Sequence, residues 1–300
     1  MTISVYIPAA LSLLLAAISR IVVGRTAPTR AVVFVIAALL CAAAATWGLV
    51  LLAATLLGDT SLAADKALEH GVQLQDPVPT LIGVTATLLL IFGMVRVVRV
   101  LRTRRATHRE LQAVCRACGT GELAVVSLDA PHAFAVPGRP GRILVTRGML
   151  TALDGDERRV VLAHERAHLH GRHHRLRAVT EVCAAVNPLL IPVREAVAYL
   201  VERSADEYAA TVTGSRELVA RALAKAALAS GSAHRMPAWS VTLRFTGCKV
   251  SARVAALRVD PPRPEPLVPS SVLALGVATA IAAVQATIAF YQLVYWLWPT

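Results

Sequence analysis

The stretch HERAHLHGRHH, residues 164–174, holds the residues whose types and spacing could support catalysis. It begins with the pattern H-E-x-x-H, and because residues four apart project from one helix face, His164 and His168 could bind one tetrahedral ion. Neutral imidazole suits Zn2+, and the neighbouring Glu165 could accept a proton from a metal-bound water as that water attacks a peptide carbonyl. The pattern predicts a site for one catalytic Zn2+ in a metallopeptidase.

The sequence leaves two candidates for the third metal ligand. With Gly171 and His174 the stretch becomes H-E-x-x-H-x-x-G-x-x-H, the metzincin pattern, in which the helix would end at Gly171 and the chain would turn His174 back to the metal. The other candidate is Glu202, in the segment ERSAD on a second predicted helix. Asp206 follows four residues later on the same face, where it could accept the other N–H of a ligand histidine.

Turn signals and hydrophobic periodicity predict an α+β module around these residues. Short β-branched runs divided by Pro and Gly predict a small antiparallel sheet, at 122–129, 132–138 and 142–148. Asp154 and Glu157 resemble a capping box at the start of the H-E-x-x-H helix. The second helix follows Pro188 and is closed by Gly214, and a further helix is predicted at about 216–230.

The composition places this module in a membrane protein. The chain has 300 residues, is 56% hydrophobic and has a mean hydropathy of +0.58. Residues 31–57 carry no charge and are long enough to cross roughly 30 Å of hydrocarbon at about 1.5 Å per residue. Further spans are predicted at about 77–95 and 267–298. The segment 3–19 is marginal in length but lacks the basic region and cleavage site of a signal peptide, which predicts a retained first span.

The loops predict the orientation of the four spans, because cytoplasmic loops retain Lys and Arg. The first loop carries three arginines and the third opens with six, whereas residues 58–76 hold one Lys and four acidic residues. Both termini are therefore predicted outside a bacterial cell membrane. The predicted domains are a membrane region at 1–95, a cytoplasmic zinc peptidase domain at 96–266, and a fourth span with a short external end at 267–300.

The net charge of +12 and the five cysteines point to no further function. Six arginines directly after a span are the usual cytoplasmic flank and are attracted to anionic lipid. Since no aromatic side chains alternate with these basic residues, direct binding to nucleic acid is not expected. Cys115 and Cys118 form one C-x-x-C without a second ligand pair, so we interpret them as ordinary thiols.

At this point the chain resembles the zinc domain of the BlaR/MecR membrane regulators. The resemblance is carried by HERAHLHGRH and by VNPLLIPVREAVAYLVERSAD, which follow that family's gluzincin pattern of HExxH, Asn-Pro-Leu and E-x-x-x-D. The family also places three spans before its cytoplasmic zinc domain and one after it. The resemblance implies that the zinc ligands are His164, His168 and Glu202, with Glu165 as the catalytic base and Asp206 as the partner of a ligand.

The same resemblance implies a membrane zinc endopeptidase that cleaves a cytoplasmic protein in signalling, such as a BlaI-like winged-helix repressor. The segment PHAFAVPGRPGRILVTRGML is closer to the HtpX and CAAX prenyl protease branch, so a quality-control peptidase is the alternative. A non-catalytic transducer that binds a repressor is a third hypothesis, although it would not need Glu165.

Three positions bear on how far this resemblance extends. Arg253, in ARVAALR, resembles a downstream arginine motif of related peptidases and is a candidate transition-state stabiliser. Its other interpretation is a solvated helix arginine. His173 stands where the BlaR/MecR family commonly has an aspartate. That family also continues into an extracellular penicillin-binding domain, whereas this chain ends at Thr300, so we expect no such sensor domain.

Overall fold

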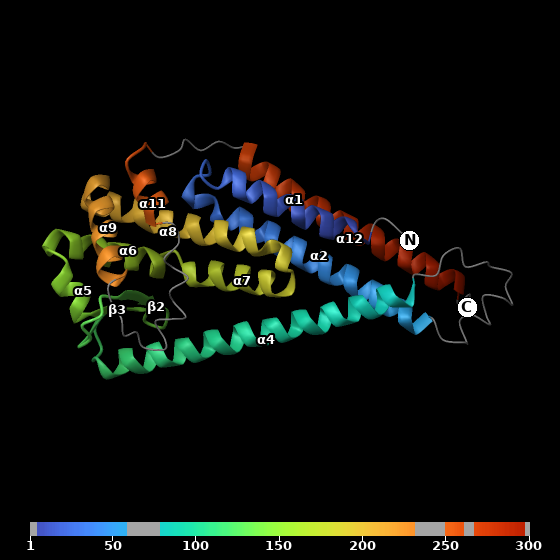
Figure 1. The fold of residues 1–300 in the computed structure, drawn as a ribbon, viewed down its shortest axis with the longest axis horizontal. Helices are drawn as coiled ribbons and strands as arrows, with labels where there is room; N and C mark the ends of the chain where they lie inside the picture. Colours follow the sequence, from blue (N-terminus) through green and yellow to red (C-terminus); the bar gives the residue numbers. More distant parts are fainter. Residues whose placement is uncertain (1–4, 59–78, 232–249, 261–266, 298–300) are drawn as a thin grey trace.

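The computed structural model describes residues 5–58, 79–231, 250–260 and 267–297. Over these residues the chain is helical apart from one small sheet, which lies at one end of an elongated molecule (Figure 1). The other end is built from apolar helices that pack against α2 (Ala31–Gly58), namely α1 (Ile7–Val22), α4 (Thr80–Ala117) and α12 (Leu267–Leu297). A 3-10 turn, η1 (Pro28–Arg30), precedes α2.

Three of the described helices are long and apolar enough to cross a membrane, over Pro28–Leu56, Thr80–Ala117 and Pro269–Gln292. They agree in position with the spans predicted at 31–57, 77–95 and 267–298. The helix α1 has 16 residues, and at about 1.5 Å per residue it is roughly 24 Å long. Because a hydrocarbon core is about 30 Å thick, the span predicted at 3–19 stays a prediction.

The helix α4 does not end where the third predicted span ends. It continues through the six arginines as far as Ala117, roughly 33 Å beyond residue 95 at about 1.5 Å per residue. Its last turns reach the sheet (Figure 1), where Leu111 and Cys115 pack in one apolar cluster with Leu144. The predicted boundary between membrane region and peptidase domain therefore falls inside one continuous helix.

The sheet has three strands in the order β1-β3-β2, with bounds β1 (Leu123–Val126), β2 (Ala133–Val136) and β3 (Arg142–Thr146). The strands β2 and β3 pair antiparallel, as predicted, but β1 pairs with β3 in parallel, so a fully antiparallel sheet was the wrong prediction. The physical reason lies in burial. Residues 143–146 of β3 are all buried, which favours the central position, and β1 and β2 are left at the two edges.

The helix α6 (Gly155–His170) begins at the predicted capping box. Asp154 Oδ1 accepts a hydrogen bond from the Glu157 backbone N–H, and Glu157 Oε2 accepts one from the Asp154 N–H, both at 2.9 Å. The Glu157 side chain is buried and accepts a hydrogen bond from Lys225 Nζ at 2.6 Å. That bond ties α6 to α9 (Arg216–Gly231), the helix predicted at 216–230. Between β3 and α6 lies the short helix α5 (Arg147–Ala152).

The helices α7 (His173–Val186) and α8 (Ile191–Thr213) form a hairpin whose closed end packs among the apolar helices (Figure 1). At that end Asn187 Nδ2 donates to Ser12 Oγ of α1 at 3.1 Å, and Asn187 Oδ1 accepts from the N–H of Leu189 in η2 (Pro188–Leu190). Gly214, with φ of 73°, ends α8 as predicted.

The two halves of α8 lie in different surroundings. Its first half packs into the apolar cluster of α1, α2 and α12, with Val193, Val197 and Leu200 fully buried. Its second half lies beside α6 and is covered by α9 and α11 (Val250–Leu257). In this way one helix connects the apolar end of the molecule to the residues that could hold a metal.

Candidate active site

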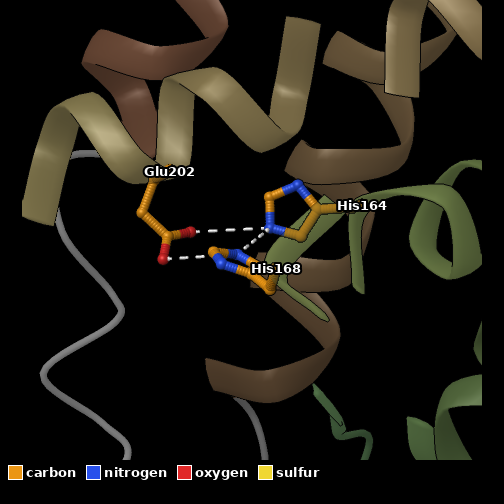
Figure 2. A group of neighbouring side chains, drawn as sticks. All are labelled: His164, His168 and Glu202. Atoms are coloured by element: carbon orange, nitrogen blue, oxygen red, sulfur yellow. Dashed lines mark hydrogen bonds and ion pairs between the residues drawn. The ribbon is translucent and has the colours of Figure 1, made fainter. Parts of the chain in front are cut away.

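Three side chains from two helices meet where the second half of α8 lies beside α6 (Figure 2). His164 and His168 lie one turn apart on α6, and Glu202 reaches them from α8. The two histidine Nε2 atoms are 3.1 Å apart. Glu202 Oε2 lies 3.6 Å from His164 Nε2, and Glu202 Oε1 lies 3.7 Å from His168 Nε2. The structure therefore brings together the three residues that the sequence proposes as ligands.

These three separations fit a tetrahedral zinc ion. Bonds of about 2.1 Å at the tetrahedral angle place two ligand atoms about 3.4 Å apart. The observed distances of 3.1 to 3.7 Å lie on both sides of that value. Two imidazoles and one carboxylate are a donor set that zinc accepts, and three protein ligands leave a fourth position for water, as catalytic sites require. The residues present thus fit one catalytic Zn2+.

The second ring nitrogen of His164, Nδ1, lies against a buried ion pair. His164 Nδ1 lies 3.1 Å from Asp206 Oδ1, one turn after Glu202 on α8. Arg253 of α11 donates two hydrogen bonds to the Asp206 carboxylate, at 2.8 and 2.6 Å, and its third nitrogen lies 3.1 Å from Glu202 Oε2. With only 4% of its surface exposed, Arg253 is not a solvated helix arginine. It holds both carboxylates that contact His164.

These carboxylates control the charge of His164. Although burial disfavours a charged imidazole, Asp206 and Glu202 raise the pKa of His164 to about 10. Burial likewise disfavours an ionised Glu202, but the neighbouring histidines and Arg253 hold the pKa of Glu202 well below its usual range. Asp206 is also kept ionised, since Arg253 and His164 lower its pKa against the effect of burial. The two carboxylates therefore favour a positively charged His164 ring.

His168 has a different neighbour, which the sequence does not assign to the site. Its Nδ1 lies 3.0 Å from the Nδ1 of His173, the first residue of α7. Burial lowers the pKa of His168 to about 3 and that of His173 to about 4, so both rings are neutral at physiological pH. Ligand histidines usually hydrogen-bond through the nitrogen that does not face the metal. His173 occupies that place for His168.

Glu165 lies next to the ligand group and faces a cavity. Burial raises the pKa of Glu165, and the nearby Glu202 carboxylate raises it further, against the lowering effects of His164 and a hydrogen bond from the backbone of Ala135 in β2. A carboxyl group with a raised pKa is better suited to take and return a proton near neutral pH. The position and surroundings of Glu165 therefore fit a general base.

Comparison with known proteins supports this chemistry. Residues 101–198 match the sequence model of peptidase family M48. The match covers about a third of the chain, from the second half of α4 into α8, and includes the H-E-x-x-H helix but ends before Glu202. Neither the curated proteins nor the solved structures give a match to the chain. The M48 match indicates a metallopeptidase, and M48 peptidases are typically membrane-associated and zinc-dependent.

A cavity of about 620 Å³ opens beside the ligand group and is lined by residues of the M48-like segment together with residues of α8, α9 and α11. One wall is β2, which contributes Ala133, Phe134 and Ala135. Among the described strands β2 is at the edge of the sheet, since it pairs only with β3. Residues of α4 and α7 also line the cavity, including Arg104 and Glu181, which form an ion pair. The cavity is thus lined by an edge strand of the sheet and by the part of α4 that continues beyond residue 95.

The other candidate third ligand, His174, does not join this group. The helix does end near Gly171, as the metzincin pattern requires, and Arg172 has φ of 48°. The turn starts a new helix at His173, however, and the backbone carbonyl of His174 accepts a hydrogen bond from Arg104 Nη2 at 3.1 Å. In the part of the chain that the structure describes, the group that could hold a metal ion is His164, His168 and Glu202.

The C-x-x-C pair lies elsewhere, at the end of α4. Cys115 is buried and Cys118 is half-buried, and both are free thiols. Neither belongs to a group of metal-ligating side chains among the described residues. The structure assigns them no part in the site.

Proposed function

We propose that this protein is a membrane zinc endopeptidase. The observation that carries the proposal is the group formed by His164, His168 and Glu202, whose ligand atoms lie at tetrahedral spacing beside Glu165 and a cavity. The M48 match over residues 101–198 and the three apolar helices support a peptidase associated with a membrane. A scaffold that only binds a repressor has no chemical need for a general base next to a metal group.

The chain supplies most of the proposed chemistry. Bound Zn2+ would polarise the substrate carbonyl and lower the pKa of a water molecule at the site. Glu165 takes a proton from the water as its oxygen attacks the carbonyl carbon, and returns the proton to the amine nitrogen when the C–N bond breaks. Arg253 lines the same cavity, and its role as a transition-state stabiliser stays a prediction.

The substrate would bind as an extended peptide along β2. The edge of β2 offers backbone groups to an added strand, and the same strand lines the cavity next to Glu165. A chain paired with β2 would pass in front of the ligand group. This mode of binding requires an unfolded segment of a protein rather than a folded surface.

We further propose a BlaR/MecR-like regulatory role, with a cytoplasmic protein such as a BlaI-like winged-helix repressor as the substrate. The support is the E-x-x-x-D arrangement of Glu202 and Asp206 and the α7–α8 hairpin. That hairpin packs against α1 and α2 and is not among the helices long and apolar enough to span a membrane. A single span after the H-E-x-x-H helix is the arrangement that the resemblance implies.

The proposed topology puts both termini outside and residues 96–266 in the cytoplasm of a bacterial cell. It rests on the arginines that follow residue 95 and on the lipid-facing exposure of α4 before them, where Leu88 and Ile91 are exposed. A reporter fused after Thr300 should therefore report an external position, and one inserted near Thr120 a cytoplasmic one. Cleavage of the 96–266 region by protease added to intact cells would contradict this topology.

The test of the peptidase uses the full-length protein purified in detergent and loaded with zinc. A library of unstructured peptides is incubated with the wild type, with Glu165→Gln and with Glu217→Gln, and new termini are identified by mass spectrometry. The wild type and the control at exposed Glu217 should cut the same bonds. Glu165→Gln should bind zinc yet cut none of them, because its ligands remain while its proton acceptor is lost.

Absence of zinc-dependent cleavage by the wild type would refute the proposed activity. Cleavage by Glu165→Gln at the wild-type rate would show that the base lies elsewhere. The cut sites also separate the two roles. Discrete cuts in a purified BlaI-like repressor favour regulation, whereas broad cutting of unfolded membrane proteins favours an HtpX-like quality-control peptidase.

A further inference from the structure

We propose that His173 is a positioning residue for the zinc ligand His168, and that Gly171 is needed to make room for the His173 ring. This inference rests on the proposed metal site and deepens it. Both residues lie at the junction of the H-E-x-x-H helix with α7.

The two ring nitrogens of His168 face different neighbours. Its Nε2 faces His164 and Glu202, at 3.1 and 3.7 Å, so this nitrogen is the one available to a metal. A neutral ring that offers Nε2 must carry its proton on Nδ1. That Nδ1 lies 3.0 Å from His173 Nδ1. His168 therefore donates, and His173 accepts with an unprotonated Nδ1.

The His173 side chain is buried and fixed against the His168 ring. Only 7% of its surface is exposed, and its ring meets the His168 ring edge-on, with centroids 4.9 Å apart and planes at 86°. An acceptor fixed in this way restricts rotation of the His168 ring. Because outer hydrogen bonds orient ligand histidines and set their tautomer, His173 keeps Nε2 directed at the metal position.

A turn between α6 and α7 places His173 next to His168. Arg172 adopts φ of 48°, and this left-handed residue reverses the chain so that the first ring of α7 lies over the end of α6. A Cβ atom on Gly171 would lie 2.3 Å from His173 Nε2 and 2.6 Å from Cδ2, which is closer than atoms can approach. Gly171 itself has φ of −72°, a conformation open to any residue. The glycine is thus required mainly by the histidine ring, and the next nearest atom is the Ala167 carbonyl oxygen at 3.1 Å.

This assignment also explains the extended H-E-x-x-H-x-x-G-x-x-H pattern. In the metzincin interpretation the glycine serves a ligand at His174. In this structure it serves His173, one residue earlier, and the carbonyl of His174 is bonded to Arg104. The same sequence pattern therefore indicates a histidine that positions the ligand His168, rather than a third ligand.

The first experiment compares His173→Asn with His173→Leu in the full-length protein in detergent. Asparagine Oδ1 can take the place of the histidine Nδ1 acceptor, whereas leucine fills the space without an acceptor. Zinc affinity is measured by competition with a chelator. We expect His173→Leu to bind zinc about 10–100-fold more weakly, the usual effect of losing such a partner, and His173→Asn to stay within about threefold of the wild type.

A residue that only fills space would give the reverse order, with leucine close to the wild type and the smaller asparagine the more damaging. That order, or wild-type affinity in His173→Leu, would overturn the proposal. The unfolding midpoint of each metal-free variant is recorded in parallel, so that lost affinity is not confused with lost structure.

The second experiment does not depend on His173→Leu folding well. Gly171→Ala should weaken zinc binding by about tenfold or more, because its Cβ displaces the His173 ring. The double variant Gly171→Ala with His173→Asn should recover part of the affinity, since asparagine has no atom at the position of Nε2, the closest contact, and keeps one only at the position of Cδ2. Gly155→Ala on the same helix is the matched control, because a Cβ there meets nothing within 4 Å.

The outcomes separate this inference from the proposed function. If the wild type binds no zinc, the proposed peptidase fails. If it binds zinc and cuts peptides while His173→Leu and Gly171→Ala bind zinc equally well, only the role of His173 and Gly171 fails. Failure of the double variant to recover any affinity over Gly171→Ala would likewise contradict the steric argument.

Discussion

The two histidines of the ligand group lie on one helix, yet they are held in opposite ways. His164 lies against the carboxylate of Asp206, which Arg253 fixes with two hydrogen bonds. His168 lies against the neutral ring of His173. The pKa of His164 is raised to about 10, because Asp206 and Glu202 together outweigh the effect of burial, and that of His168 is lowered to about 3, because burial outweighs the single neighbouring carboxylate, Glu202.

The difference shows that one metal site can combine two kinds of support. A carboxylate beside a ligand histidine stabilises a positive charge there and must itself be balanced, which is the role of Arg253. A neutral acceptor fixes the ring without adding another buried charge, whose uncompensated burial would be costly. The site therefore concentrates its carboxylates on α8, around Glu202 and Asp206, whereas on α7 the neutral His173 faces His168 and Arg177 pairs with Glu202 Oε1 at 3.4 Å.

The carboxylate that both histidines share should show the largest effect. Glu202→Ala leaves two imidazoles from one helix, too few for a stable catalytic site, so we expect bound zinc to fall below detection after dialysis. His174→Ala should keep about one zinc per chain, because His174 stands outside the ligand group. Zinc per chain, measured by atomic absorption on both purified variants, decides between them.

The opposite result would be informative as well. Loss of zinc in His174→Ala with retention in Glu202→Ala would restore the metzincin interpretation. The comparison of the two histidines would then need a different third ligand.

The support of His164 should show a smaller effect. Asp206→Asn keeps the shape of the side chain but removes the charge that faces His164 and Arg253, so we expect zinc affinity to fall about 10–100-fold without loss of the site. Asp156→Asn is the matched control, since Asp156 lies on the exposed side of α6 and pairs only with Arg159 among the described contacts. An Asp206→Asn protein that binds zinc like the wild type would show that the two histidines do not differ as described.

The parts of this site that sequence could predict are local. The capping box of Asp154 and Glu157, the four-residue spacing of His164 and His168, and the stop at Gly214 each depend on residues within one turn of each other. Each is present in the structure. Glu202 and Asp206 could be proposed because they also keep a helical spacing, although the pairing of their helix with α6 had to come from the resemblance.

The parts that sequence could not predict depend on contacts between distant segments. Arg253 is 47 residues from Asp206, and nothing near it in the chain signals burial. The parallel pairing of β1 with β3 depends on which strand is most buried. The sequence shows His173 as one of several histidines. Its role follows from the turn at Arg172, and the only local sign of that role is the glycine two residues before it.

The smallest expected effect is on the pH dependence of zinc binding, which should distinguish His164 from His168. The raised pKa of His164 means that the metal-free site keeps this proton up to about pH 10, whereas His168, with a pKa of about 3, has none to lose. Zinc must displace the His164 proton, so the apparent affinity should rise about tenfold per pH unit between pH 6.5 and 8.5.

Calorimetric titration in two buffers of different ionisation enthalpy should show release of about one proton per zinc. In Asp206→Asn the pKa of His164 should fall toward its usual value, and proton release at pH 8.5 should shrink. Release of no proton by the wild type would mean that the surroundings of the two rings are more alike than the structure indicates.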